Sequence, residues 1–158
     1  MTRLIKIPAM LILVAGLAAL PSAAAVHTSP FNGHMSGSSV ATSEVGNNLT
    51  ATIFLNHLGR SQLVGTTTVT GQNACGGFIG TEKDTITAPN GDKIFLFGHG
   101  VSCPTSPTTF QDTVTFTITG GTGRFADASG SGTTQTAITI TSQTTATFTA
   151  TITGTISR

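Results

Sequence analysis

Apolar and polar residues alternate with a period of two along most of the chain after residue 26. The alternation is clearest in 112–119 and 145–156, and shorter in 136–141, where Thr alternates with Val, Ile, Phe or Ala. Successive side chains of a strand point to opposite faces, so each segment is predicted to be a strand with one apolar face and one Thr face. Thr suits this position because it is β-branched and stays solvated without a charge.

Further strands with a less regular pattern are predicted at 31–42, 49–58, 61–70, 81–88 and 93–100. Between the last two lies Pro-Asn-Gly-Asp at 89–92, a strong signal for a hairpin turn. The pattern therefore predicts an all-β chain, a single antiparallel β-barrel of about eight strands, with a β-sandwich as the alternative. A closed barrel would leave no exposed strand edge in a chain with few charges to protect one.

The amino-acid composition argues against several classes of protein. Thr is the most frequent residue, charged residues make up only 8% of the chain, and the formal net charge is +1. A nucleic-acid-binding protein needs a basic patch, so we expect no nucleic-acid partner. A charge-rich disordered tail and a helical bundle are disfavoured for the same lack of charged residues.

Residues 1–25 have the layout of a secretory signal peptide. Arg3 and Lys6 precede an apolar run over 7–20, and Ala23 and Ala25 fit a cleavage site before residue 26. The run is short for a bilayer-spanning helix, although an uncleaved membrane anchor is the alternative. We therefore expect a barrel domain over 26–158 that is secreted or periplasmic, with no membrane span after signal cleavage.

The chain has two cysteines, Cys75 and Cys103. An even number in an exported protein predicts a disulfide, although two buried free thiols are the alternative. Cys75 precedes the strand expected to begin near Phe78, and Cys103 follows the strand expected to end near Gly100. The intervening hairpin would bring the two cysteines together. Their spacing does not fit a structural zinc site, and we expect no metal there.

The most distinctive segment is Thr-Gly-Gly-Thr-Gly-Arg-Phe-Ala-Asp-Ala-Ser-Gly-Ser-Gly-Thr at 119–133. Its first glycines predict a tight turn after a strand, and its apolar residues are expected to cover one end of the core. The residues that define this structural motif are Gly120, Gly121, Thr122, Gly123, Arg124, Phe125, Ala128 and Gly130.

This segment resembles the G-G-T-G-x-F-x-x-A-x-G motif of dirigent and allene oxide cyclase-like proteins, where it links two strands of an eight-stranded antiparallel barrel. It is even more similar to small exported bacterial proteins with G-G-T-G-R-F-A-x-A-x-G-S-G-T before a Thr-rich hairpin. The resemblance implies the barrel, and dirigent proteins often form trimers, although nothing else in the sequence supports an oligomer. Plant dirigent proteins usually carry Arg at the position of Ser129, so the resemblance implies no catalytic residue here.

Two groups of charged residues could carry chemistry. Arg124 and Asp127 flank Phe125 and would be a cation and an acid at the barrel mouth, or, as we expect, a local ion pair or turn contacts. Glu82 and Asp84 lie two apart on a predicted strand and share a face, so they could form an acid–base pair. Because the charged Lys83 lies between them, we expect a solvated strand face instead.

The remaining candidates are weaker. The four histidines, His27, His34, His57 and His99, have no spacing that demands a common metal site, so solvated side chains are expected. Gly120–Gly123 lacks the Lys and the following helix of a phosphate-binding loop, and no serine lies in a G-x-S-x-G motif. The sequence therefore predicts no catalytic residue and no cofactor.

Phenylalanines supply much of the predicted apolar face, which either fills the barrel or lines a ligand cavity. They are Phe54, Phe78, Phe95, Phe97, Phe110, Phe116, Phe125 and Phe148. The leading hypothesis is a non-enzymatic protein that binds a small hydrophobic ligand or acts through its surface. One alternative is a dirigent- or cyclase-like protein that steers a reaction of such a molecule, which an open cavity with buried polar residues would favour. The other is a structural envelope or matrix protein, which a solidly packed barrel would favour.

Overall fold

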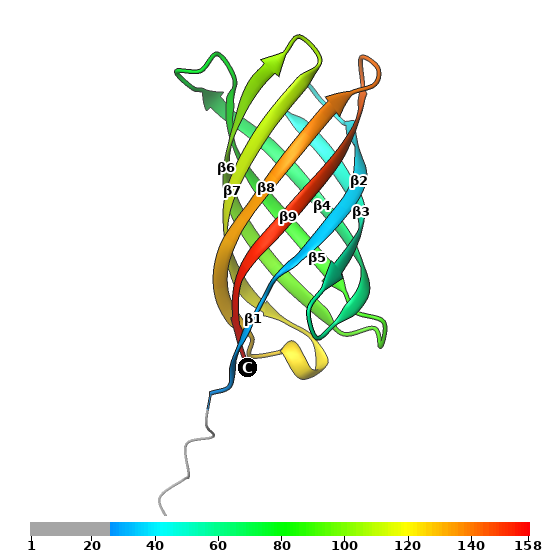
Figure 1. Ribbon diagram of the computed structural model, residues 1–158, viewed down its shortest axis with the longest axis vertical. Helices are drawn as coiled ribbons and strands as arrows, with labels where there is room; N and C mark the ends of the chain where they lie inside the picture. Colours follow the sequence, from blue (N-terminus) through cyan, green and yellow to red (C-terminus); the bar gives the residue numbers. More distant parts are fainter. Residues whose placement is uncertain (1–25) are drawn as a thin grey trace, which may run out of the picture.

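The antiparallel strands form a sheet that closes on itself as a barrel (Figure 1), in a computed structural model that describes residues 26–158. The strands are β1 (Thr28–Pro30), β2 (Gly33–Ala41), β3 (Gly46–Leu55), β4 (Gly59–Gln72), β5 (Phe78–Thr87), β6 (Lys93–Ser106), β7 (Thr109–Gly121), β8 (Ser129–Ile140) and β9 (Thr145–Ser157). Each of β2 to β8 pairs with the next strand in the chain, and β9 closes the barrel on β2. The predicted eight-stranded barrel is confirmed and the sandwich is excluded.

The short strand β1 was not predicted. It pairs with the end of β9, beyond the segment of β9 that pairs with β2. The signal peptide predicted at residues 1–25 lies outside the described residues. Within residues 26–158, no helix is long and apolar enough to cross a membrane.

The predicted turn at 89–92 joins β5 and β6. The Ala88 amide donates to the Asp92 carbonyl at 2.8 Å, and Gly91 has a φ of +89°, a conformation that glycine adopts without strain. The predicted disulfide between Cys75 and Cys103 is confirmed, with Cα atoms 5.8 Å apart. The prediction that β6 ends near Gly100 was wrong. The strand continues through Cys103 because its backbone stays paired with β7 up to Ser106.

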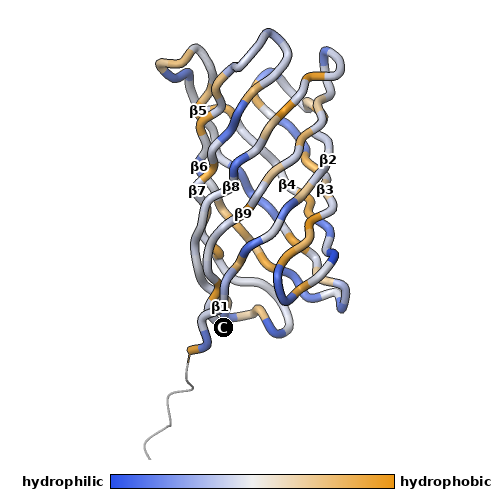
Figure 2. Tube along the Cα trace, in the orientation of Figure 1, coloured by the Kyte–Doolittle hydropathy of each residue, from blue (hydrophilic) through white to orange (hydrophobic). Residues whose placement is uncertain are grey.

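The hydrophobic core lies inside the barrel. Apolar and polar positions alternate along the strands (Figure 2). Three of the phenylalanines assigned to the apolar face point outward instead. Phe54 is 43% exposed, and Phe95 and Phe97 are only partly buried, whereas Ile94 and Leu96 between them are buried. On β6 the alternating aliphatic residues occupy the interior, so the intervening aromatic rings must lie outside.

The barrel is plugged at one end, which we call the closed end and define by Phe31, Phe116, Phe125, Ala128 and Ile156. The segment between β7 and β8 turns beneath the barrel as a short 3-10 helix, η1 (Gly123–Phe125), drawn in yellow in Figure 1. It places Phe125 in the core with 1% exposure, and Ala128 is also buried. The rings of Phe31 and Phe116 meet edge to face with centroids 6.0 Å apart. The plug is therefore built almost wholly from apolar side chains.

The opposite end, which we call the open end, is formed by the loops at 42–45, 73–77, 107–108 and 141–144. Its loops are not backed by a helix, and the disulfide lies here between the 73–77 loop and β6.

Candidate functional site

A cavity of about 280 Å³ occupies the interior at the open end. All eight barrel strands contribute to its wall. Its apolar side chains include Met35, Leu49, Leu63, Phe78, Phe110, Val114, Ile138 and Phe148. Its volume is at the lower limit for a small-molecule pocket. The space equals that of roughly nine water molecules in the liquid, so a ligand of about ten non-hydrogen atoms would fill it.

β6 carries no inward side chain at Gly98 and Gly100; Gly100 lines the cavity, and Val114 of β7 packs against both glycines. A Cβ atom at Gly98 would lie 2.7 Å from Val114 Cγ1, and one at Gly100 would lie 2.8 Å from Val114 Cγ2. Towards the closed end the same face of β6 carries Ile94 and Leu96, which fill the core. On β6 the inward side chains therefore become smaller from the packed half of the interior to the hollow half.

Three carboxyl groups point into the barrel from two strands, and this overturns the prediction of a solvated face for Glu82 and Asp84. Ile86 is fully buried on β5, so the residues two and four positions before it face inward as well, while Lys83 is exposed. Asp112 is likewise in phase with the buried Val114 on β7. Glu82 and Asp112 line the cavity.

Asp84 lies one inward position deeper than Glu82 and packs against Gly65 of β4. A Cβ at Gly65 would collide with Asp84 Oδ1, so the glycine provides the space for the carboxyl group. Burial, together with the hydrogen bonding and negative charge of neighbouring Glu82, raises the pKa of Asp84 to about 10. Asp84 Oδ1 is buried and has no hydrogen-bond partner in the described part of the chain. At neutral pH this carboxyl group is therefore protonated.

Asp112 sits between Ser102 of β6 and Thr136 of β8 in the sheet register. Burial raises its pKa above the ordinary value, the Ser102 hydroxyl lowers it, and the negative charge of Glu82 raises it. Asp112 Oδ1 is buried and has no hydrogen-bond partner within residues 26–158.

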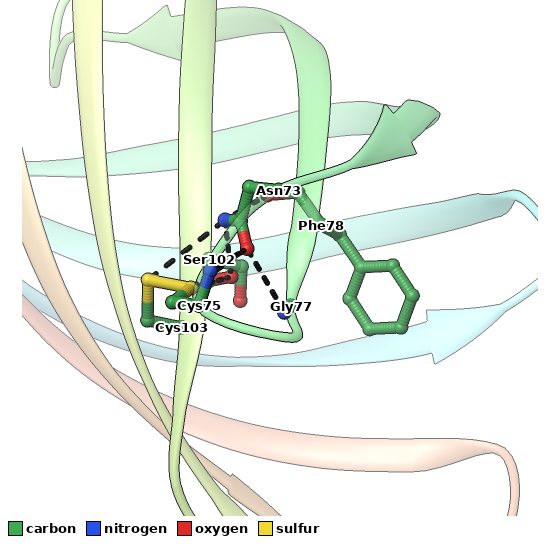
Figure 3. The surroundings of a disulfide bond; sticks show 6 residues. All are labelled: Asn73, Cys75, Gly77, Phe78, Ser102 and Cys103. Carbon is green, nitrogen blue, oxygen red and sulfur yellow. Dashed lines mark hydrogen bonds between the residues drawn. A yellow bond between two sulfur atoms is a disulfide. The ribbon is translucent and has the colours of Figure 1, made fainter.

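Two aromatic rings border the cavity near its mouth. Phe78 and Phe110 stack with centroids 6.4 Å apart, and Phe78 is 41% exposed. Figure 3 shows how Phe78 is positioned by the loop before it, with its ring pointing away from the disulfide. The Asn73 side chain accepts from the Gly77 amide at 2.9 Å and donates to the Ser102 carbonyl at 3.2 Å. Together with the disulfide, these bonds hold the start of β5 against β6.

The glycine-rich motif lies at the closed end, away from the cavity. Gly123 has a φ of +57°, and a Cβ there would collide with the Asp92 carboxyl group. Arg124 pairs with Asp92, Nε to Oδ2 at 3.7 Å, and not with Asp127 as the sequence suggested. Its guanidinium group also lies 4.9 Å from the centroid of the Phe125 ring. Arg124 and Asp127 are therefore not polar groups of the cavity mouth.

The four histidines are placed separately. His34 stacks on Phe54 with centroids 5.2 Å apart, and His99 meets Phe97 edge to face at 4.9 Å, both on strands whose aromatic rings face outward. His57 lies in the turn between β3 and β4, and His27 lies next to β1. In residues 26–158 no three His, Cys, Asp or Glu side chains come together as a metal site.

The sequence contained the signal that identifies the inward carboxyl groups. Asp112 precedes Val114, Phe116 and Ile118 at a spacing of two, which puts it on the apolar face. Glu82 and Asp84 have the same spacing to Ile86. The charge of Lys83 led to the wrong prediction. When two carboxyl groups two positions apart on a strand face inward, the residue between them must face outward, so a charged Lys83 is compatible with inward carboxyl groups.

Comparison of the chain with protein-family models, with curated proteins and with solved structures found no significant match.

Proposed function

We propose that this chain is an exported protein whose barrel binds a small, mainly apolar molecule in the open-end cavity. The observation that carries the proposal is a hollow in one half of an otherwise packed barrel, with an apolar wall and only a few polar groups. Small-molecule sites have this composition. A purely structural barrel has no need of an unfilled interior, because empty space removes packing energy.

Export is supported by two independent features. The first 25 residues have signal-peptide composition, and the disulfide between Cys75 and Cys103 requires an oxidising compartment to persist. A location outside the cytoplasm would also give the open end direct access to molecules in the surroundings of the cell.

The binding proposal is tested with a cavity-filling variant. Ile138 points into the cavity from β8, whereas its neighbour Thr139 is exposed on the outside. Ile138→Trp should abolish binding of a small, neutral, apolar fluorescent probe such as naphthalene, and Thr139→Trp should leave it unchanged. Thermal unfolding of both variants verifies that they fold. Equal probe binding by the two variants would contradict the proposal.

A second function is favoured by one observation, the presence of carboxyl groups in the cavity wall. Burial raises the pKa of Asp112 in the cavity wall, and a carboxyl group of raised pKa can donate a proton, so the barrel could steer a reaction of its ligand, as in the dirigent- and cyclase-like alternative. Mass spectrometry distinguishes the two functions: a binder returns an apolar ligand unchanged, and an enzyme returns a product of altered structure.

A further inference from the structure

We infer that the ligand of the open-end cavity is a small hydrophobic amine, bound as its cation with the ammonium group between Glu82 and Asp112. This inference rests on the proposed function and names the chemistry of its ligand. It is carried by three features of the cavity: its carboxyl groups have no cationic partner, one of their oxygen atoms has no hydrogen-bond donor, and its mouth is aromatic.

The first feature is an uncompensated negative charge. Glu82 and Asp112 both line the cavity, and their charges act on each other. No basic side chain lines the cavity in the described part of the chain. Lys83 points outward from β5, and Arg124 and Arg158 lie against Phe125 at the closed end. Buried charges in proteins are normally paired, so a cavity with carboxylates and no cation is complementary to a positive ligand.

The second feature is the unfilled hydrogen-bonding capacity of Asp112. Its Oδ1 atom is buried without a partner among residues 26–158, although Ser102 lies beside it. Buried polar atoms almost always have a partner. An ammonium group has three donors and no acceptor, so it can satisfy carboxylates on both β5 and β7 at once.

The third feature is the aromatic mouth. Phe78 and Phe110 lie at the entrance to the cavity and expose their rings to an entering molecule. The face of an aromatic ring attracts a cation, and this attraction grows as water is removed. The rings and the aliphatic wall, which includes Val114 and Ile138, also provide a surface for the apolar part of the amine.

Binding of the cation is coupled to release of protons. Burial raises the pKa of Asp112, so the fraction of Asp112 that is still protonated loses its proton to solvent when the carboxyl group pairs with an ammonium ion, and one carboxylate–ammonium pair forms. The groups that face this site are Glu82 and Asp84 from β5 and Asp112 from β7. The inward faces of β4, β6 and β8 bear no titratable side chain in the described structure. Affinity for the amine should therefore rise with pH.

The test compares three probes that share one apolar part: phenylbutylamine, phenylbutanol and phenylbutyrate. Each has roughly the size that the cavity admits. Titration calorimetry at pH 7 should show that the amine binds at least about tenfold more tightly than the alcohol and that the acid binds most weakly. Because burial raises the pKa of Asp112, the affinity for the amine should rise with pH and that for the alcohol should not, a readout that needs no variant.

Variants locate the ammonium group. Glu82→Gln and Asp112→Asn should each reduce the preference for the amine over the alcohol by about threefold or more, while leaving the alcohol affinity nearly unchanged. Asp127→Asn makes the same change of charge at the closed end and should have no effect.

Equal binding of amine and alcohol, or tightest binding of the acid, would overturn the amine inference and leave the proposed binding function standing. An amine preference that Asp127→Asn reduces as much as Asp112→Asn would also overturn it, because the preference would then follow net charge. Binding of none of the three probes would overturn the inference, and it would count against the binding function if the cavity-filling variant also left probe binding unchanged.

Discussion

The two ends of this barrel differ in how the interior is filled: apolar side chains plug one end, and a cavity lies at the other. At the closed end, η1 lies beneath the barrel and buries Phe125, and Phe31, which follows β1, is buried there as well. At the open end the loops are short, and the interior contains a cavity of about 280 Å³ whose wall includes Glu82 and Asp112. The same eight strands run through both ends, so the difference comes from the residues at successive inward positions.

This contrast shows how one strand can serve both stability and function. On β6 the inward residues change from Ile94 and Leu96 to Gly98 and Gly100. Buried aliphatic side chains stabilise the fold through the hydrophobic effect, and their absence leaves room for polar groups that the packed half could not contain. The closed end therefore provides the stability that allows the open end to remain hollow.

The largest effect is expected from removing the plug. Phe125→Ala should lower the free energy of unfolding by about 4 kcal/mol, because the ring is fully buried and its loss leaves a cavity. Phe78→Ala at the open end removes the same group from a half-exposed position and should cost only about 1 kcal/mol. Urea unfolding of both variants measures the difference. Equal losses would show that the two ends are packed alike.

Next in size is the disulfide, which stabilises the open end without packing. Replacing Cys75 and Cys103 by Ser should reduce the free energy of unfolding by about 3.5 kcal/mol, because the bond closes a loop with a sequence separation of 28. Hydrogen exchange should then increase for amides of the 73–77 loop and the start of β5, and remain unchanged around η1. Increased exchange at both ends would mean that the ends are not independently stabilised.

Substitution of Asp84 is expected to have a smaller effect and to increase the free energy of unfolding, whereas the two preceding changes decrease it. Its pKa is about 10 in the folded protein and about 3.9 in an unfolded chain, so the folded state retains one more proton between those values. The free energy of unfolding must therefore fall as pH rises from about 4 towards 10. Asp84→Asn should stabilise the protein by about 2 kcal/mol at pH 7 and should have little effect at pH 3.

Urea unfolding at a series of pH values measures this dependence. Asp127→Asn is the matched control, because it removes a carboxyl group from the turn at the closed end, and it should leave the slope unchanged. An unchanged slope in Asp84→Asn would contradict protonation of the buried carboxyl group.

Much of the barrel could be predicted from local pattern. The Thr alternation identified β7, β8 and β9, and the Asn90-Gly91 turn fixed the hairpin that brings the two cysteines together. These features depend on neighbouring residues only. The short strand β1 lacks any such pattern, because its position is set by pairing with the far end of β9.

The candidate site was harder to predict, because its residues come from different strands and form a cavity only when the sheet closes. Alternation assigns Asp112 to the apolar face of β7, but it does not tell whether that face meets a packed core or a cavity. That depends on the inward residues of all eight strands, which come together only in the assembled barrel. Phe95 and Phe97 were misassigned for a related reason: hydrophobicity alone does not decide which set of alternate residues faces inward.

The smallest effect on the free energy of unfolding is expected from removing a charged side chain at the closed end. Arg124→Ala removes the ion pair with Asp92 and the contact with the Phe125 ring, yet the Arg124 side chain is 47% exposed, so the loss should stay below about 1 kcal/mol. Half of that loss or more should persist in 1 M salt if the ring contact dominates, because salt weakens the exposed ion pair more than the close contact with the ring. A loss comparable to that of Phe125→Ala would mean that charge holds the plug in place. The expected small loss would show that the buried Phe125 ring, and not charge, stabilises the plug. Charge would then have a role in ligand binding at the acidic open end and little role in the stability of the closed end.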